Sequence, residues 1–514
     1  MKLEFYGAAK CVTGSCHIMR FNKKTILLDC GLFQGKDEKI RGNDEFPFDP
    51  KKIDYVILSH AHIDHSGRIP LLYKKGFKGE VICTRATKEL CNIMLPDSGY
   101  IQETETEWKN RKRIRQGLDT IEPLYTAKMA ELSMYLFRDY DYDEMIEVFD
   151  GFKIRFREAG HLLGSSIVIV EMYIKEDYED EVKIVYTGDL GNTNKPIIRD
   201  PNYITYADYI IMETTYGDRV HGDMDWSFKE LVNIITDTFE RGGNVIIPSF
   251  SVGRTQEVLY ALSKYVKNNI LKDVTIFVDS PLAANTSKIY EKCSDYYDSE
   301  MKNLVRNGLN PLNFKGVKYT NTPQESIQIN KFKGNAIIIS ASGMCEAGRI
   351  KHHLKHNLWR KECSVVFVGY QAEGTLGRAI LDGNKKVNLF GETIAVNAKI
   401  YNLEGLSGHA DKNGLVDWVD KLMVRPKEIF LVHGDTKSQK NFKELLDSKG
   451  FKSRIMDVFE TYYINEHLKL NDENIKYRLM KLLNSIDNVE DMSKEILMKE
   501  IEKTIDNDNA KAAK

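Results

Sequence analysis

The sequence predicts an α/β protein in which a parallel α/β domain is inserted into an outer domain, with a helical extension at the C-terminal end. Three observations predict this class. The first 90 residues alternate short β-rich runs with turns, strands and helices alternate from about residue 209, and the last 50 residues contain neither Gly nor Pro. The expected limits are 1–208 and 392–464 for the outer domain, 209–391 for the insertion and 465–514 for the extension.

The outer domain begins with short runs rich in strand-forming residues. The expected strands are LEFYG, CHIMRF, TILLDCG, DYVILSH and VICTR, with a short helix over IPLLYKKG that ends at Gly76. A long charged helix is expected from about residue 88 to residue 135. Two further strands, FKIRFREAGH and VKIVYTGDL, each end at polar residues.

The insertion is expected to form a parallel sheet, because its strands are separated by helices such as TQEVLYALSKYVK. Its expected strands are YIIMETTYG, GNVIIPSF, TIFVDSP, NAIIISASG and SVVFVGY. A helix over residues 414–423 and the strand EIFLVHG then complete the outer domain. The extension has apolar residues at helical spacing, which predicts a helical appendage that packs on the body or on a second subunit, as in a homodimer.

Composition and charge exclude several classes of protein. The 514 residues carry 73 Lys and Arg against 75 Asp and Glu, a net charge of −2, and 42% of them are apolar. This balance is typical of a soluble globular protein and excludes collagen, a disulfide scaffold and a fully disordered chain. It argues against a protein that coats nucleic acid by charge alone, but it leaves room for a local basic groove.

Three features of the sequence indicate a cytoplasmic protein without membrane contact. No apolar run reaches the roughly 18 residues of a membrane-spanning helix. The first residues lack the basic start, apolar stretch and cleavage site of a signal peptide. The eight cysteines are scattered and form no CxxC pair, which is typical of a reduced cytosolic protein.

The segment His60-Ala-His62-Ile-Asp64-His65 carries the chemistry. It follows the strand YVILS, so its side chains lie on a loop where they can converge. Neutral imidazoles and carboxylates are the ligands that suit zinc at an open catalytic site. His60 and His62 can point to the same side, whereas Asp64 and His65 point elsewhere, which suits a second metal about 3.5–4 Å away.

With the following SG, this segment resembles the HxHxDH signature of the metallo-β-lactamase fold, whose αββα sandwich is the expected outer domain. The rest of that signature is present in order. Asp29 in LLDCGLFQG resembles the early aspartate that braces the metal loop. His161 in EAGHLLGSS resembles the third histidine of the first metal site, and Asp189 in YTGDLG resembles the carboxylate that bridges both metals.

The second half resembles the β-CASP nucleases. Glu213 in METTYG is similar to their acidic motif A, His409 in LSGHAD to the motif B histidine and His433 in LVHGD to the motif C histidine. The segments IPSFSVGRTQE, SASGMCEAGR and VGYQAEGTLGR resemble the inserted β-CASP domain. The resemblance extends to about Asn465 and is greatest to bacterial and archaeal relatives of the cleavage-and-polyadenylation endonuclease.

This resemblance implies a site with two Zn²⁺ per chain. The first zinc would be held by His60, His62 and His161, the second by Asp64, His65 and His433, and Asp189 would bridge them. It implies that water activated there, next to Asp64, attacks an RNA phosphodiester. His409 is the expected general acid, with Glu213 holding its tautomer, and Asp29 is expected to orient the metal loop.

Two loops and one helix of the insertion are expected to contact RNA. Strand-to-helix loops offer backbone N–H groups and side chains to phosphates, although their serines could equally be ordinary helix caps. The helix in GRIKHHLKHN is expected to line the RNA groove, or to have a purely structural face. The expected RNA contacts are Ser249, Arg254, Ser340, Ser342, Gly343, Arg349 and His352.

The leading hypothesis is a zinc-dependent endoribonuclease of RNA processing or decay, with 5′-to-3′ exonuclease action as an additional mode. A DNA nuclease of the same superfamily, a non-catalytic scaffold and a small-molecule hydrolase are the alternatives. The histidine at position 433 favours RNA over DNA by resemblance, and the complete ligand set argues against a scaffold. The basic run Lys109–Arg115 is expected to be a solvated helix face or a secondary RNA contact.

Overall fold

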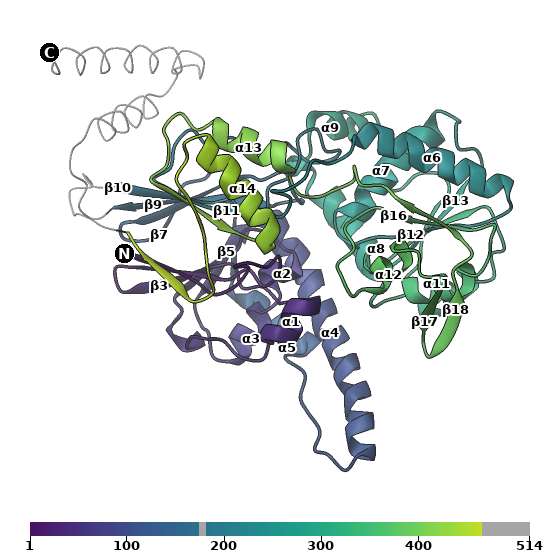
Figure 1. Ribbon diagram of the computed structural model, residues 1–514, viewed down its shortest axis with the longest axis horizontal. Helices are drawn as coiled ribbons and strands as arrows, with labels where there is room; N and C mark the ends of the chain where they lie inside the picture. The colour runs from purple at the N-terminus through teal and green to yellow at the C-terminus, as the bar shows by residue number, and fades with distance from the viewer. Residues whose placement is uncertain (174–180, 465–514) are drawn as a thin grey trace.

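The outer domain is a sandwich of two seven-stranded sheets in the computed structural model, which describes residues 1–173 and 181–464 (Figure 1). The extension expected over residues 465–514 lies outside the described residues. The first sheet has the order β22 (Glu460–Tyr463), β1 (Lys2–Phe5), β2 (His17–Phe21), β3 (Lys24–Leu28), β4 (Tyr55–Ile57), β5 (Glu80–Thr84) and β6 (Phe137–Tyr140).

The second sheet packs face to face on the first, and their facing side chains form one apolar core. In strand β8 (Phe152–Glu158), buried and half-buried residues alternate, so one face of the strand points into this core. The order of this sheet is β21 (Ser453–Ile455), β20 (Glu428–Val432), β11 (Tyr209–Glu213), β10 (Glu181–Tyr186), β9 (Ser166–Tyr173), β8 (Phe152–Glu158) and β7 (Ile146–Phe149).

Helices cover the outer faces of both sheets, which completes the expected αββα arrangement (Figure 1). The second sheet packs against α13 (Lys412–Asp420) and α14 (Thr436–Ser448). The helices and 3₁₀ turns of the first half are α1 (Gly35–Arg41), η1 (Pro50–Lys52), α2 (Ile63–Ser66), α3 (Ile69–Lys74), α4 (Arg85–Arg115), α5 (Ala127–Ser133) and η2 (Met134–Leu136). In the described ranges, no helix combines the length and the apolar character needed to cross a membrane.

The inserted domain has a six-stranded sheet whose pairings are all parallel, as the alternation of strands and helices predicts. Its order is β14 (Val317–Tyr319), β13 (Thr275–Asp279), β15 (Ala336–Ser340), β12 (Val245–Pro248), β16 (Ser364–Phe367) and β19 (Lys399–Asn402). The other elements are α6 (Met224–Glu240), α7 (Arg254–Lys267), α8 (Pro281–Lys292), η3 (Ser294–Tyr296), α9 (Ser299–Arg306), α10 (Pro323–Ile329), α11 (Ile350–Asn357), α12 (Leu376–Leu381) and the hairpin β17–β18 (Lys386–Leu389 and Glu392–Ala395).

Sheet membership moves the expected limits of the insertion. Strand β11, expected as the first strand of the insertion, pairs with β10 and β20 in the outer domain. Strand β19, expected in the returning outer segment, pairs with β16 in the inserted sheet. All five residues of β11 are buried, so its sequence pattern does not indicate which sheet it joins. We therefore propose limits near residues 214 and 402.

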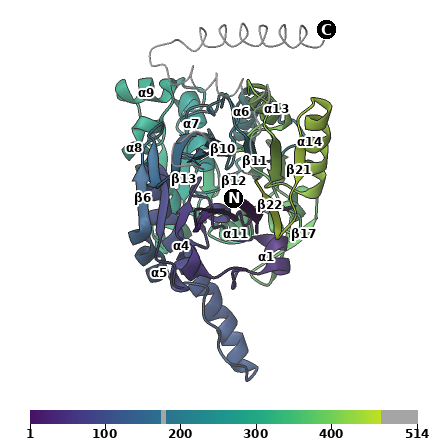
Figure 2. The same ribbon diagram turned by 90° about the vertical axis from the view of Figure 1, so that its left-hand side faces the viewer.

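The long helix expected up to residue 135 is shorter than predicted. Helix α4 ends at Arg115, and Gly117 follows with a φ of +71°, which favours glycine. The last buried residue of α4 is Thr106, and beyond it the helix projects from the body (Figures 1 and 2). We call this part, residues 107–115, the arm; it carries the whole basic run.

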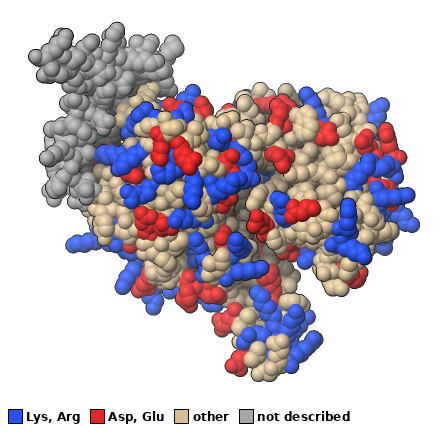
Figure 3. All heavy atoms as spheres, in the orientation of Figure 1, with Lys and Arg blue, Asp and Glu red and all other residues tan. Residues whose placement is uncertain are grey.

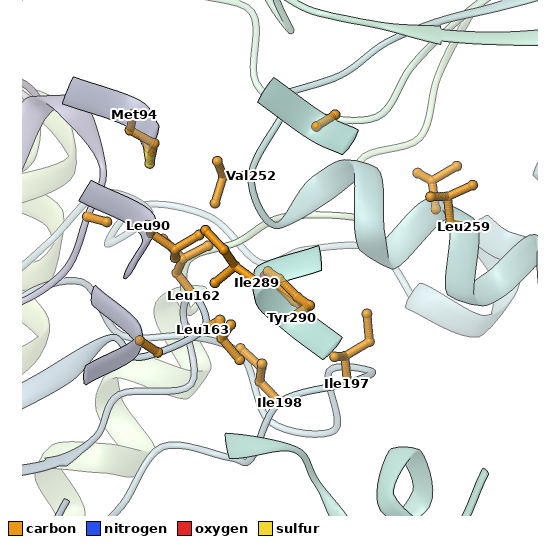
Figure 4. Close-up of a cluster of buried hydrophobic side chains, with 14 of the residues drawn as sticks. Leu90, Met94, Leu162, Leu163, Ile197, Ile198, Val252, Leu259, Ile289 and Tyr290 are labelled. Carbon is orange, nitrogen blue, oxygen red and sulfur yellow. The ribbon is translucent and has the colours of Figure 1, made fainter. Parts of the chain in front are cut away.

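An apolar cluster joins the two domains beside the loop that carries His161 (Figure 4). Leu90 of α4 and Leu162 of that loop belong to the outer domain, whereas Ile289 and Tyr290 come from α8 of the insertion. All four side chains are buried in one continuous core. Because this core is shared, the insertion is held against the His161 loop.

Candidate metal and catalytic site

Three histidines and one aspartate converge at the end of the sandwich. His60 and His62 lie on the loop after β4, His161 follows β8, and Asp189 follows β10. His62 Nδ1 lies 3.1 Å from both His60 Nε2 and His161 Nε2. Asp189 Oδ2 lies 3.4 Å from His60 Nε2 and 3.6 Å from His161 Nε2. This spacing suits one cation shared by four ligand atoms.

A second group shares the same aspartate. His65 Nε2 lies 3.1 Å from His433 Nε2, and His433 Nε2 lies 3.5 Å from Asp64 Oδ2. Asp189 Oδ1 faces this group, 3.3 Å from His65 Nε2. The buried Asp189 Oδ1 has no hydrogen-bond partner among the described residues, which is the state expected of an oxygen that ligates a cation. Both groups therefore offer ligand-type atoms, and the two oxygens of Asp189 face one group each.

Burial sets the protonation of the first group. It lowers the pKa of His62 to about 4 and the pKa of His60 and His161 well below 6.5. Neutral imidazole is the form that binds metal, so these three side chains are ready as ligands. For His65, burial lowers the pKa but the carboxylates of Asp189 and Asp64 raise it more. The same negative charge would attract a cation.

Asp29 accepts hydrogen bonds from the loop that carries the ligand-type histidines. Its Oδ1 accepts a hydrogen bond from Ser59 N at 2.7 Å. Its Oδ2 accepts from Ser59 Oγ at 2.7 Å, from His65 Nδ1 at 2.7 Å and from Tyr186 OH at 2.6 Å. The bond to Nδ1 leaves His65 Nε2 facing Asp189. Tyr186 was not identified from the sequence, although it precedes Asp189 by only three residues.

Lys195 is another contributor that the sequence did not indicate. Its buried ammonium group donates to the carbonyl of His161 at 2.8 Å and forms an ion pair with Glu257 at 3.1 Å. Glu257 belongs to α7 of the insertion, so this pair ties the inserted domain to the backbone of a ligand residue. An isolated lysine in NTNKPI gives no sequence signal for this role.

The expected contact between His409 and Glu213 is present. His409 Nδ1 lies 3.1 Å from Glu213 Oε2, and the carboxylate also accepts from Thr215 Oγ1 at 2.6 Å. Burial lowers the pKa of His409, but the carboxylates of Glu213 and Asp189 raise it more, so the pKa lies above 6.5. His409 keeps 20% of its side chain exposed, whereas Glu213 is fully buried. The pair can therefore hold a proton at an accessible imidazole.

The two serine-rich loops of the insertion lie side by side, because Ser249 N donates to Ser340 O at 3.0 Å. Their side chains are used within the protein. Ser249 Oγ accepts from Thr255 Oγ1, Ser340 Oγ donates to Asp279 O, and Ser342 Oγ bonds to Ala347. Gly343 packs on Phe250, whose ring would lie 2.9 Å from an added Cβ. Arg254 forms an ion pair with Glu257 at 2.5 Å.

The structure does not bring Arg349 and His352 to the cluster of metal-type residues. Arg349 donates to Asp279 Oδ1 at 2.7 Å, and His352 stacks on Phe390 with the ring centres 4.4 Å apart. Neither residue has a described hydrogen bond, ion pair or ring contact with the two histidine–aspartate groups. The surface is hollowed between the two domains on the face shown in Figure 3, and contact of these residues with RNA stays a prediction.

Three family models match successive parts of the chain. The metallo-beta-lactamase superfamily matches residues 9–218, the Beta-Casp domain matches residues 255–380, and the Zn-dependent metallo-hydrolase RNA specificity domain matches residues 393–456. The first match includes β11, in agreement with its place in the outer domain. The matched families therefore follow the order of outer domain, insertion and returning segment.

Several curated proteins are similar over most of their length. A ribonuclease of Thermus thermophilus is 35% identical, covering 88% of this chain and 97% of the relative. An RNase J-like protein of Methanocaldococcus jannaschii is 32% identical, covering 84% and 92%. The transcription termination factor FttA of Methanosarcina mazei is 30% identical, covering 85% and 67%. A crystal structure of a protein of unknown function from Enterococcus faecalis V583 matches 90% of this chain and 99% of its own, with a TM-score of 0.50 and 14% identity, and so shares the fold.

Proposed function

We infer the function from the family: the chain belongs to the β-CASP metallo-hydrolases of the metallo-β-lactamase superfamily, and we propose that it is a zinc-dependent ribonuclease. It would hydrolyse RNA phosphodiester bonds as an endonuclease, with 5′-to-3′ exonuclease action as an additional mode. The observation that carries the proposal is the position of Asp189 between two groups of ligand-type side chains. Two metal ions held close together are the arrangement that many phosphatases and nucleases use.

The ligands divide as the spacing of their atoms suggests. His60, His62 and His161 would hold one zinc, and Asp64, His65 and His433 would hold the other, with Asp189 shared. Bound zinc would supply Lewis acidity, both for attack of water on phosphorus and for the charge that develops on the phosphoryl oxygens. Asp29 would keep His65 in the required tautomer through its 2.7 Å bond to Nδ1.

His409 would deliver the proton that the departing 3′ oxygen needs. Glu213 accepts from Nδ1, which leaves Nε2 as the nitrogen that can face the substrate. The raised pKa of His409 favours the protonated form that a general acid requires. Glu213 in turn accepts a hydrogen bond from Thr215 Oγ1, which fixes its carboxylate. The imidazole of His409 is therefore oriented by Glu213, and Glu213 by Thr215.

RNA is the favoured substrate for two reasons. The third family model is described as an RNA specificity domain, and it covers both His409 and His433. The T. thermophilus relative is named a ribonuclease. A DNA nuclease is the alternative function. A cleavage assay that compares RNA with DNA of the same sequence separates the two.

The decisive experiment incubates the zinc-loaded protein with 5′-labelled RNA bearing a 5′ phosphate or a 5′ hydroxyl, and with DNA of the same sequence. Internal RNA products that disappear on chelation and return with zinc are expected. Products that shorten stepwise from a 5′-phosphorylated end would add the exonuclease mode. Asp189→Ala should abolish cleavage and lower the zinc content, while the exposed Asp150→Ala should do neither. Zinc-loaded protein that leaves RNA intact would refute the proposal, and equal cleavage of DNA would favour the alternative.

We also propose a cytoplasmic enzyme that forms a homodimer. All eight cysteines are free and buried, which is compatible with a reducing compartment. Light scattering on the purified protein tests the dimer, because a mass near 59 kDa would correspond to one chain.

A further inference from the structure

A cleft of about 260 Å³ lies where the two domains meet. Its walls come from the loop after β3, from α4 and from Leu282 of α8 in the insertion. Ile63 also lines it, and this residue lies between the ligand-type residues His62 and Asp64. Both domains therefore shape the cleft, and one of its lining residues belongs to the segment that carries His62 and Asp64.

Asp97 of α4 places a carboxyl group in this cleft without a partner. No hydrogen bond or ion pair joins Asp97 to any residue that the structure describes. Two other polar residues of the cleft are engaged, since Asn43 bonds to both backbone atoms of Phe33, and Ser98 bonds to Tyr125. Gln102 also lines the cleft, and its buried Oε1 has no hydrogen-bond partner among the described residues. Burial raises the pKa of the Asp97 carboxyl, and no neighbouring cation opposes this rise. A partly buried carboxylate without a donor is unfavourable, so it favours a ligand that brings N–H groups.

The rest of the cleft indicates the shape and charge of that ligand. Ile63, Met94, Ile101 and Leu282 supply apolar walls, which suit the faces of a flat ring. Glu38 also lines the cleft, so its charge disfavours a phosphate. The bases of an RNA chain combine a flat ring with N–H donors, whereas its backbone carries phosphates. A base therefore fits this cleft better than the backbone does.

Guanine matches a carboxylate better than the other bases do. Its N1–H and N2–H₂ groups are adjacent donors that can meet both carboxylate oxygens. Adenine and cytosine each place an acceptor beside the amino group, and uracil has one N–H between two carbonyls. Only guanine therefore offers two parallel hydrogen bonds without bringing an acceptor toward Asp97.

We propose that this cleft binds a guanine base of the RNA near the scissile phosphate, with Asp97 as the residue that recognises it. The inference rests on the proposed ribonuclease function and adds base specificity to it. Asp97 acts by positioning one nucleotide and takes no part in the bond-breaking step. Its loss should therefore raise KM more than it lowers kcat.

The test uses a uridine-rich RNA with one variable base, moved stepwise along the strand around a mapped cleavage site. Wild-type protein should cleave the guanosine RNA with a kcat/KM roughly 5- to 100-fold above the adenosine RNA when the base reaches the cleft. Inosine, which lacks the N2 amino group, should lose part of this advantage. Asp97→Asn should bring the guanosine-to-adenosine ratio close to one. Glu105→Gln, an exposed carboxyl on the same helix, should keep the wild-type ratio.

The outcomes separate the two hypotheses. Cleavage without a guanosine preference, or a preference that survives in Asp97→Asn, would overturn the guanine site while leaving the ribonuclease intact. The first result would favour a cationic side chain of a protein partner as the occupant, and the second would mean that guanosine is recognised elsewhere in the protein. If no RNA is cleaved, the ribonuclease proposal fails. Fluorescence anisotropy with the same oligonucleotides then decides whether Asp97 still selects guanosine in binding, and equal affinities would refute the site as well.

Discussion

Glu158 gives a stability prediction that can be worked from the structure. It ends β8, only 3% of its side chain is exposed, and its Oε1 accepts from Gly160 N at 2.9 Å. Its Oε2 has no hydrogen-bond partner among the described residues, and its one ion pair, with the Arg199 guanidinium, is long at 3.6 Å. Burial raises the pKa of Glu158 from 4.5 to about 8. The carboxyl is therefore mostly protonated in the folded protein at neutral pH.

The magnitude follows from the two pKa values. The folded value of about 8 and the ordinary value of 4.5 differ by roughly 3.5, which corresponds to about 5 kcal/mol as an upper bound. Between these values the unfolded chain releases the proton and the folded chain keeps it. The contribution of Glu158 to stability is therefore fully present below pH 4.5, falls as pH rises, and is lost above about pH 8.

Glu158→Gln should remove the loss of stability at high pH, because the amide stays neutral. Its side-chain oxygen can still accept the hydrogen bond from Gly160 N. At pH 5 the urea midpoints of variant and wild type should nearly coincide, and by pH 9 the variant should be more stable by about 2–5 kcal/mol. Unfolding is followed by circular dichroism at fixed zinc from pH 5 to 9. Glu147→Gln, an exposed site on the neighbouring β7, should run parallel to wild type. A constant difference between Glu158→Gln and wild type across this range would refute the reasoning.

Three further predictions concern the site and the arm. His409→Ala should retain zinc but lower kcat roughly 10²- to 10⁴-fold, because it removes the proposed general acid. Loss of zinc in the metal analysis would instead identify His409 as a metal ligand. Asp29→Ala should weaken zinc binding roughly 10- to 100-fold in a chelator competition, since His65 and Ser59 lose their acceptor, and unchanged affinity would contradict the bracing role. Replacing the five basic residues of the arm by Gln should weaken RNA binding and flatten its salt dependence, whereas an unchanged salt slope would exclude this contact. The residues are Lys109, Arg111, Lys112, Arg113 and Arg115.

The main features of the fold could be predicted because they depend on local patterns. The alternation of short strands and helices in the insertion predicts its parallel sheet. The short β-rich runs at the start of the chain likewise predict strands β1, β2 and β3. The domain limits were not predictable in the same way. Both β11 and β19 are short strands, and which sheet each joins depends on partners far away in the sequence.

The ligand-type residues were predictable for a different reason, namely that a metal site requires particular side chains. His60, His62 and His65 stand within six positions, so the sequence alone predicts that they cluster, as they do in the structure. The RNA contacts lack such a constraint. Arg254 and Arg349 each have an acidic partner in the folded protein, Glu257 and Asp279, and only the second of these pairs is distant in sequence. An arginine in a loop therefore does not by itself indicate a phosphate contact.

The position of His433 near the C-terminal end of the outer domain has a consequence for translation. His433 lies 368 positions after His65, and the strand before it, β20, fills the place beside β11. At roughly 5–20 residues per second, a ribosome needs about 20–70 seconds to add this interval. During that time the growing chain has an unfilled sheet edge and an incomplete ligand set. We therefore expect an interrupted translation product that lacks β20 and His433 to be inactive, because its set of ligand-type side chains is incomplete.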